Sequence, residues 1–315
     1  MLIIILDGKT ALQGAISGID LCLRTVIPSL FPFFILTGIL SNTIIGHRFS
    51  LLQPICRFCK IPDGSASLLI LGLLAGYPVG AQLVSQAQRD GNLSYSSAIR
   101  MAAFCNNAGP SFIFGILSTM FIHSYNAWFL WGIQIISALI VGVLLPSYNV
   151  DPCNLHKPSS ISVTKAMERA IKTMASVCGW VIASRILLGF CKIWFLWRFP
   201  VAVQVLISGL FELSNGCVRL HEVSSEGLRF VLASILLSAG GLCVTMQTVS
   251  VSKNIITRVY FLGKVMQVFI TFLLSLITQM LLYSGPDRLF FPFGVSITLC
   301  VAVIFGIFII FRKKI

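Results

Sequence analysis

Four apolar stretches of this 315-residue chain place polar side chains beside glycine or proline, residues that interrupt helices. The stretches are GYPVGAQ at 76–82, CNNAGPSF at 105–112, FELSNG at 211–216 and GGLCVTMQ at 240–247. A break of this kind frees backbone N–H groups at the start of the following half-helix. Such an N-terminus carries partial positive charge, which suits an anion, and nearby Asn, Gln and Ser side chains can orient that anion.

The candidate substrate-binding residues form or flank these breaks. They are Gly76, Pro78, Gly80, Gln82, Asn106, Asn107, Gly109, Ser111, Glu212, Ser214, Asn215, Gly240, Gly241 and Gln247. The adjacent carboxamides of Asn106 and Asn107 need several hydrogen-bond partners when buried, which favours a binding role. The GYPVG stretch is equally compatible with a simple kink, because glycine and proline are common in membrane helices. Ser85, Ser111 and Ser250 are typical of close helix packing.

Glu212 is the acidic residue most clearly inside an apolar run. A charge near the centre of a bilayer costs several kcal/mol on insertion scales. Its presence therefore indicates a protonated carboxyl, a transport pathway or a partner such as Arg185. The alternative is that the segment ends at Glu212 and leaves the carboxylate at the interface.

The composition identifies the elements that must position these residues. Hydrophobic residues make up 57% of the chain and charged residues only 10%, with a mean hydropathy of +0.93. Soluble domains usually contain about 25% charged residues. We therefore predict an all-α, polytopic integral membrane protein with about eight to nine hydrophobic segments and a retained N-terminus. The candidate segments are 26–42, 66–87, 97–121, 127–146, 172–191, 200–216, 229–250, 259–283 and 290–311.

The breaks follow the same order in each half of the chain, which predicts two related halves with discontinuous helices. Gly80 and Gly216 are 136 residues apart, and Gly109 and Gly240 are 131 apart. Many transporters consist of two such repeats, whose broken helices meet near the middle of the membrane. The predicted units are a first repeat at 1–146 with an amphipathic lead-in at 8–25, a polar linker at 147–165, a second repeat at 166–258 and C-terminal helices at 259–315.

The Lys and Arg residues do not define the orientation. A nine-span arrangement places eleven of them on each side, with Arg100 on one side, Lys264 on the other and Arg185 within a span. Membrane proteins rarely divide their positive charges so evenly between the two sides. We therefore expect some of these segments to be re-entrant rather than to cross the membrane. The C-terminal RKK sequence favours a cytoplasmic C-terminus.

The sequence lacks the motifs that are typical of enzymes, metal-binding proteins and nucleic-acid-binding proteins. The sequence contains no Ser/His/Asp order, no HExxH and no phosphate loop, so we expect neither an enzyme nor a cofactor. Cys56 and Cys59 form a CxxC without a second ligand pair, so we expect no metal. The positive charges are spread among short loops, which argues against nucleic acid.

Together, the four motifs resemble the YlbJ/SpoVV family of sporulation integral membrane proteins, within the group that carries the nucleoside-recognition Gate domain. The resemblance extends from SLFPFFILTG at 29–38 to the last hydrophobic segment. It implies a role in endospore formation and movement of dipicolinic acid from the mother cell across the outer forespore membrane. The expected partners are then an anionic small molecule, which a net charge of +13 would attract, and the lipid bilayer. A carrier of nucleosides or other polar metabolites and a non-transporting assembly factor remain alternatives.

Overall fold

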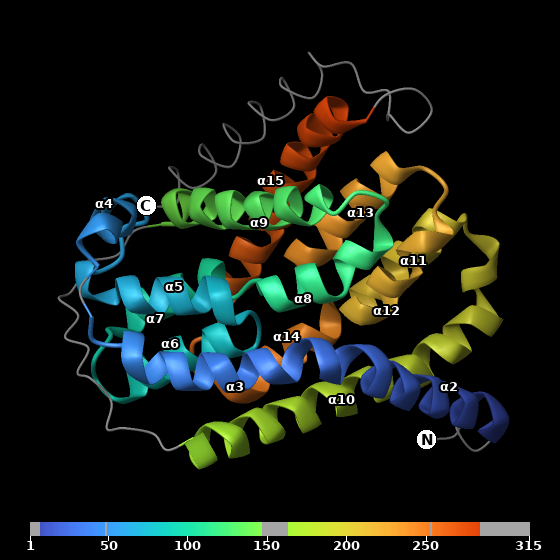
Figure 1. Cartoon of the computed structure of the whole chain (residues 1–315), viewed down its shortest axis with the longest axis horizontal. Coiled ribbons are helices and arrows are strands. Elements are labelled where there is room, and N and C mark those ends of the chain that lie inside the picture. The colour runs from blue at the N-terminus through green and yellow to red at the C-terminus, as the bar shows by residue number, and fades with distance from the viewer. Residues whose placement is uncertain (1–6, 48, 147–162, 253, 284–315) are drawn as a thin grey trace.

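The computed structural model of this chain describes residues 7–47, 49–146, 163–252 and 254–283 (Figure 1). Every regular element in these ranges is a helix, which confirms the predicted all-α class. Five helical stretches are long and apolar enough to cross a bilayer by length and composition. They are Gly8–Ser41, Tyr125–Leu144, Val163–Trp194, Glu226–Ser252 and Arg258–Leu282. A sixth candidate is a helix pair bent by 114°, Ser50–Phe58 with Asp63–Ala75.

Four predicted segments, 66–87, 97–121, 200–216 and 229–250, are each interrupted between two α-helices. Segment 290–311, the RKK sequence and most of the linker at 147–165 lie outside the described residues. The total of eight to nine segments therefore stays a prediction.

In the described part of the chain, the first helix is α2 (Gly8–Leu21), which continues through a π-helical turn into α3 (Ile27–Ile44). Asp7 starts α2, because its carboxylate accepts a hydrogen bond from the Thr10 N–H at 3.0 Å. Glycines in GAISG let α2 pack closely on α10 (Val163–Trp194): a Cβ on Gly14 would lie 2.8 Å from the Cα of Ile186. Small residues four apart permit such close approach of membrane helices.

The broken elements of the first half follow in sequence. After the short α4 (Gln53–Phe58), they are α5 (Ala66–Ala75) with α6 (Val79–Arg89), and α7 (Tyr95–Cys105) with α8 (Pro110–Gly115). The unbroken α9 (Tyr125–Leu144) completes this half. The helices thus end and restart at the glycines and prolines of the sequence motifs, as the loss of backbone hydrogen bonds there requires.

The second half repeats this order of elements. The long α10 precedes α11 (Val201–Phe211) with α12 (Leu213–Val218), then α13 (Glu226–Ala239) with α14 (Gly241–Ser252), and finally α15 (Arg258–Leu282). Each half therefore contains, in this order, a long helix, two interrupted helix pairs and another long helix. That the halves are related in three dimensions remains a prediction.

Helix α15 joins the two halves because it packs against α7 and α9 as well as α13. At its closest approach to α7, a Cβ on Gly263 would lie 2.9 Å from the Cβ of Ala103. This contact brings the following residue, Lys264, beside the break between α7 and α8.

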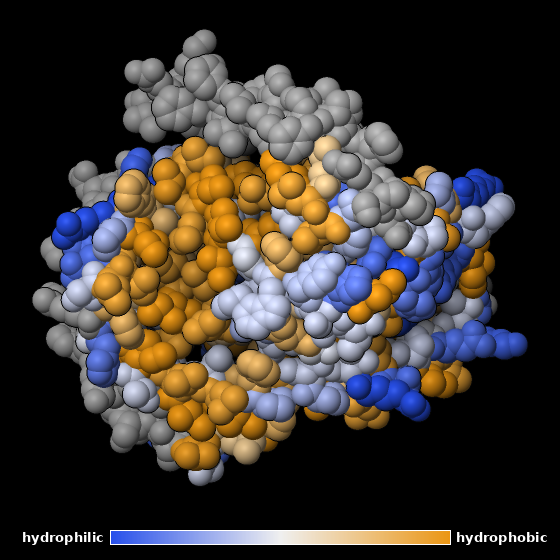
Figure 2. Space-filling view, turned by 45° about the horizontal axis from the view of Figure 1, so that its top comes forward, coloured by the Kyte–Doolittle hydropathy of each residue, from blue (hydrophilic) through white to orange (hydrophobic). Residues whose placement is uncertain are grey.

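The outer surface suits a lipid environment. Large apolar side chains such as Leu12, Trp128, Val265 and Leu281 are exposed on the long helices. Figure 2 shows a wide hydrophobic surface left of the centre of the view, with hydrophilic residues along the left edge and more extensively toward the right end. Such an apolar band with polar ends is the pattern expected of a protein that crosses a bilayer.

Candidate binding site at the helix breaks

The two breaks of the first half lie directly against each other. The Tyr77 N–H donates a hydrogen bond of 2.8 Å to the carbonyl of Asn107. Gly76 has a φ of +75°, and a Cβ at this position would lie only 2.7 Å from the backbone nitrogen of Gly109. Glycine is therefore required at Gly76 both by its backbone conformation and by the closeness of the second break.

Asn106 connects this pair of breaks to the second half of the chain. Its buried Nδ2 donates to Thr248 Oγ1 of α14 at 3.1 Å and to Tyr260 Oη of α15 at 3.2 Å. Its Oδ1 is buried without a hydrogen-bond partner. The carbonyl oxygen of this carboxamide therefore accepts no hydrogen bond, which is unusual for a buried polar atom.

Asn107 orients toward Lys264, a residue that the sequence analysis did not select. The Asn107 Nδ2 donates to the Phe104 carbonyl at 2.6 Å, while its Oδ1 accepts from the Lys264 Nζ at 3.2 Å. The same ammonium also contacts the Asn106 carbonyl, and Gln267 Oε1 at 3.2 Å.

All the partners of Lys264 Nζ are neutral oxygens. Within the described ranges, no carboxylate lies within 4.0 Å of this ammonium. The signal in the sequence was a lysine inside the apolar segment 259–283, which the orientation count had assigned to one side of the membrane. Cations inside membrane helices are costly and commonly mark functional sites.

In the second half, Glu212 occupies the start of α12. Its Oε1 accepts from the Ser214 N–H at 3.0 Å and its Oε2 from the Asn215 N–H at 2.8 Å. The carboxylate is only 4% exposed, so it lies inside the protein rather than at a solvated interface. No ion pair within 4.0 Å joins it to Arg185 in the described residues.

Asn215, one turn into α12, is fully buried, and neither polar atom of its carboxamide has a hydrogen-bond partner. A buried carboxamide normally satisfies most of its bonding capacity. Asn215 is therefore the least satisfied of the predicted binding residues in the described part of the chain, while Ser214 beside it is buried as well.

The break between α13 and α14 reaches the first half through Tyr77. A Cβ on Gly240 would lie 3.7 Å from the Tyr77 ring, and one on Gly241 would lie 2.7 Å from the Gly209 carbonyl of α11. The Tyr77 hydroxyl is buried without a partner. The Gln247 Nε2 donates to the Cys243 Sγ of its own helix at 3.7 Å, and the neighbouring Thr248 supplies the link to Asn106.

Not all the predicted residues join this group. Gln82 instead lines a separate cavity of about 60 Å³ between α3, α6 and α10, together with Gln86 and Arg169. Ser111 is buried on α8, while Pro78 directly precedes α6 and Gly80 packs against the Cys105 carbonyl. The residues that do gather at the breaks of the first half form what we call the break cluster, which consists of Tyr77, Asn106, Asn107, Lys264 and Gln267.

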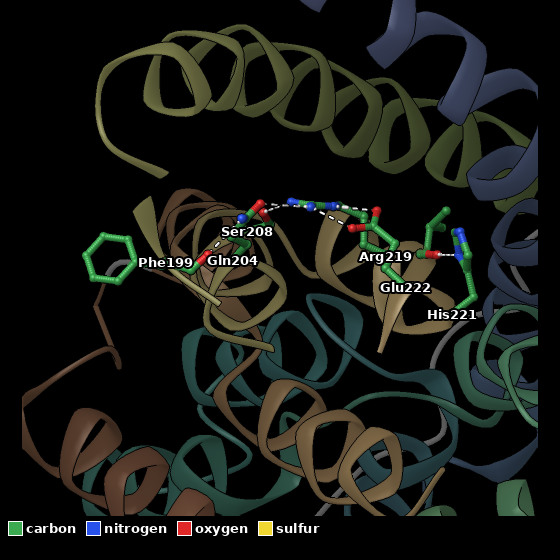
Figure 3. A network of polar contacts seen from close by, with 7 residues as sticks. Phe199, Gln204, Ser208, Arg219, His221 and Glu222 are labelled. Atoms are coloured by element: carbon green, nitrogen blue, oxygen red, sulfur yellow. Dashed lines mark hydrogen bonds and ion pairs between the residues drawn. The ribbon is translucent and has the colours of Figure 1, made fainter. Parts of the chain in front are cut away.

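A second polar group lies after α12 and ties it to α11 (Figure 3). The Arg219 guanidinium donates two hydrogen bonds to the Glu222 carboxylate, at 2.8 and 2.7 Å, and one to Ser208 Oγ at 3.1 Å. These bonds hold the pKa of Glu222 below its ordinary value of 4.5. Because every member is paired, the group is better suited to fixing α12 than to binding a ligand.

The described residues contain no group of three or more His, Cys, Asp or Glu side chains arranged to hold a metal ion. Cys56 and Cys59 are both buried as free thiols, and the Cys59 Sγ lies 3.8 Å from the Leu139 carbonyl.

Comparison with known proteins gives one informative match. No family model matches the chain, and no solved structure is similar to it. The chain is 24% identical to "Sporulation integral membrane protein YlbJ" of Bacillus subtilis (strain 168), with 84% of this chain and 76% of that protein aligned. Together with the long apolar helices, this similarity identifies an integral membrane protein.

Proposed function

We propose that this protein belongs to the YlbJ family and carries a small organic anion across a membrane during endospore formation, binding it at the break cluster. The observation that carries the proposal is the Lys264 ammonium, which lies in a membrane helix and whose hydrogen bonds within the described part of the chain all go to neutral oxygens. A buried charge is stable only when its lost hydration is replaced, and an opposite charge replaces it best. An anionic substrate would supply that charge.

An unpaired donor beside Lys264 supports the same ligand chemistry. The Gln267 Nε2 is buried without a partner in the described residues, and the Oε1 of the same side chain accepts from the Lys264 Nζ at 3.2 Å. Carboxylate oxygens accept several hydrogen bonds at once, and bonds to charged groups are stronger than neutral ones. A compact carboxylate therefore fits this set of groups better than a neutral sugar or base.

Dipicolinate is the substrate we propose, because it is a flat aromatic dicarboxylate and the chain resembles the YlbJ/SpoVV family. The proposed direction is from the mother cell across the outer forespore membrane. The breaks pack closely in this conformation, since Gly76 contacts Gly109 and Gly240 contacts Tyr77. Substrate entry would therefore require these breaks to separate, as in carriers whose half-helices move between states.

The test is uptake into vesicles that contain the purified protein. Dipicolinate, uridine and a dicarboxylate without an aromatic ring are supplied separately. We expect saturable uptake of dipicolinate, at least ten times faster than that of uridine. Uptake of uridine alone would identify a nucleoside carrier, and no saturable uptake of any compound would favour an assembly factor.

Variants at the cluster connect uptake to the proposed site. Asn107→Ala removes an oxygen that orients Lys264, and Asn106→Ala removes the links to Thr248 and Tyr260. Each should reduce uptake about tenfold or more, equivalent to about 1.4 kcal/mol or more. Asn92→Ala, in the turn after α6, removes the same chemical group and should transport normally. Normal uptake by both cluster variants at equal abundance would show that the cluster only packs helices.

A further inference from the structure

A cavity of about 400 Å³ lies between α2 and α10, away from the break cluster. Thr10, Gln13 and Ser17 of α2 contribute polar side chains to its lining, and Arg185 and Lys192 of α10 contribute two cations. The two cations are seven residues apart, which places them two turns apart on one face of α10.

Within the described residues, no carboxylate in contact balances the charges of these two cations. The Arg185 Nε is buried without a hydrogen-bond partner, and in the described residues no carboxylate lies within 4.0 Å of Arg185 or Lys192. The charged neighbours that interact with Arg185 from other elements are Glu212, Arg219 and Glu222. Glu222 bonds to Arg219, and Glu212 bonds to the N–H groups of α12. The cavity is therefore left with a net positive charge.

The cavity lies near one end of α10, where several aromatic side chains are exposed. Trp194, Trp197 and Phe199 are each more than 40% exposed, and the Arg198 guanidinium lies 5.2 Å from the centre of the Trp197 ring. Exposed aromatic residues at the end of a membrane helix commonly mark the level of the lipid headgroups. Lys192 precedes Trp194 by two residues, so its ammonium is within reach of that level.

The helices around the cavity also offer an apolar surface to acyl chains. Ile193, which lines the cavity, is 55% exposed, and Leu187 on α10 is 54% exposed. On α2, Leu12 and Ile16 are exposed as well. A ligand that combines a negative headgroup with hydrocarbon chains would match both the charged cavity and its surroundings.

We propose that this cavity binds the phosphate headgroup of an anionic phospholipid. The phosphate oxygens would accept hydrogen bonds from the Arg185 guanidinium and the Lys192 ammonium, with Thr10 and Gln13 as further donors. Arginine is well suited to phosphate because its planar donors match two oxygens at once. The bound lipid joins α2 to α10 and adds to the close packing at Gly14. A soluble phosphate has the same headgroup chemistry, but it leaves the exposed apolar surface unused.

The experiment measures lipid binding and thermal unfolding of the purified full chain in detergent. Phosphatidylglycerol, phosphatidylcholine with the same acyl chains, and soluble glycerol phosphate are added separately. We expect phosphatidylglycerol to bind and raise the Tm, and the other two to have little effect. An equal effect of phosphatidylcholine, or an effect of glycerol phosphate alone, would overturn the proposal.

Two variants test the residues independently. Lys192→Gln removes an exposed cation and should weaken phosphatidylglycerol binding about tenfold, whereas Lys172→Gln, an exposed lysine elsewhere on α10, should not. Ser17→Trp keeps both cations but fills the cavity, and should also prevent binding. Undiminished binding by both Lys192→Gln and Ser17→Trp would refute this site.

Discussion

Replacing Lys264 with methionine should separate stability from transport. Methionine has nearly the same length, so Lys264→Met removes the charge without opening a large space. The substitution leaves the Asn106 carbonyl, the Asn107 Oδ1 and the Gln267 Oε1 without their shared donor. It also removes an ammonium that has no carboxylate partner within 4.0 Å in the described residues.

These two effects oppose each other. Each buried acceptor that loses its donor costs about 1–3 kcal/mol, although the Gln267 side chain can rotate toward another partner. Burying an ammonium without an opposite charge costs several kcal/mol, and the substitution relieves that cost. We therefore expect the free energy of unfolding to change by no more than about 2 kcal/mol. Uptake should fall about 100-fold, because a charged hydrogen bond to an anion contributes about 1.5–3 kcal/mol.

Arg100 provides the contrasting case. Its buried guanidinium donates to the carbonyls of Cys59 at 2.8 and 3.1 Å and Leu145 at 2.7 Å, and it also contacts those of Gly142 and Pro146. These carbonyls lie at or near helix ends, where they have no helical donors. Arg100→Met should therefore destabilise the protein by about 3–5 kcal/mol.

The assay combines thermal unfolding in detergent with vesicle uptake at matched protein abundance. Lys264→Met should unfold near the wild-type temperature and transport poorly, whereas Arg100→Met should unfold at a much lower temperature. A Lys264→Met protein that is strongly destabilised yet transports normally would refute the reasoning, because the lysine would then be a structural cation.

Three further substitutions test the architecture. Gly76→Ala should destabilise the protein by about 2–4 kcal/mol in thermal unfolding, because its Cβ would overlap the neighbouring break. Gly91 has a similar φ of +72° but open space around it, so Gly91→Ala should cost only about 1 kcal/mol. Asn215→Leu should leave the Tm unchanged or higher, because it replaces a buried carboxamide without hydrogen-bond partners; a clearly lower Tm would contradict this. Glu222 has a lowered pKa, so its contribution to stability is full above pH 4.5 and is lost as the pH falls through its folded pKa. The Tm advantage of wild type over Glu222→Gln should therefore shrink on acidification, and an advantage that grows would contradict this.

The sequence indicated where helices end but not which helices meet. Glycine and proline interrupt helices by local geometry, so the ends of α5, α7 and α13 follow from nearby residues. The environments of Arg100 and Lys264 depend on helices that are distant in sequence. The count of charges on the two sides of the membrane therefore treated Arg100 and Lys264 alike. The structure separates them, because Arg100 donates to helix-end carbonyls and Lys264 belongs to the break cluster.

Some signals were present in the sequence but were not used. GAISG in the predicted lead-in helix has the small-residue spacing that allows close packing, and the structure places it on α10. The cavity beside it depends on where α2 crosses α10, which no local pattern reports. FELSN likewise has an acidic residue directly before a short helix, where carboxylates commonly cap N–H groups.

The capping by Glu212 changes where an anion is best accommodated. The sequence analysis expected a substrate anion at the N-termini of half-helices. At α12 the Glu212 carboxylate already accepts from the first N–H groups, so a second anion there would meet like charge. The Lys264 ammonium has the opposite character, because its partners are neutral and its charge is not balanced by any carboxylate in contact among the described residues. The electrostatics therefore favour binding of an anion between the α7–α8 break and α15, with Glu212 holding the start of α12.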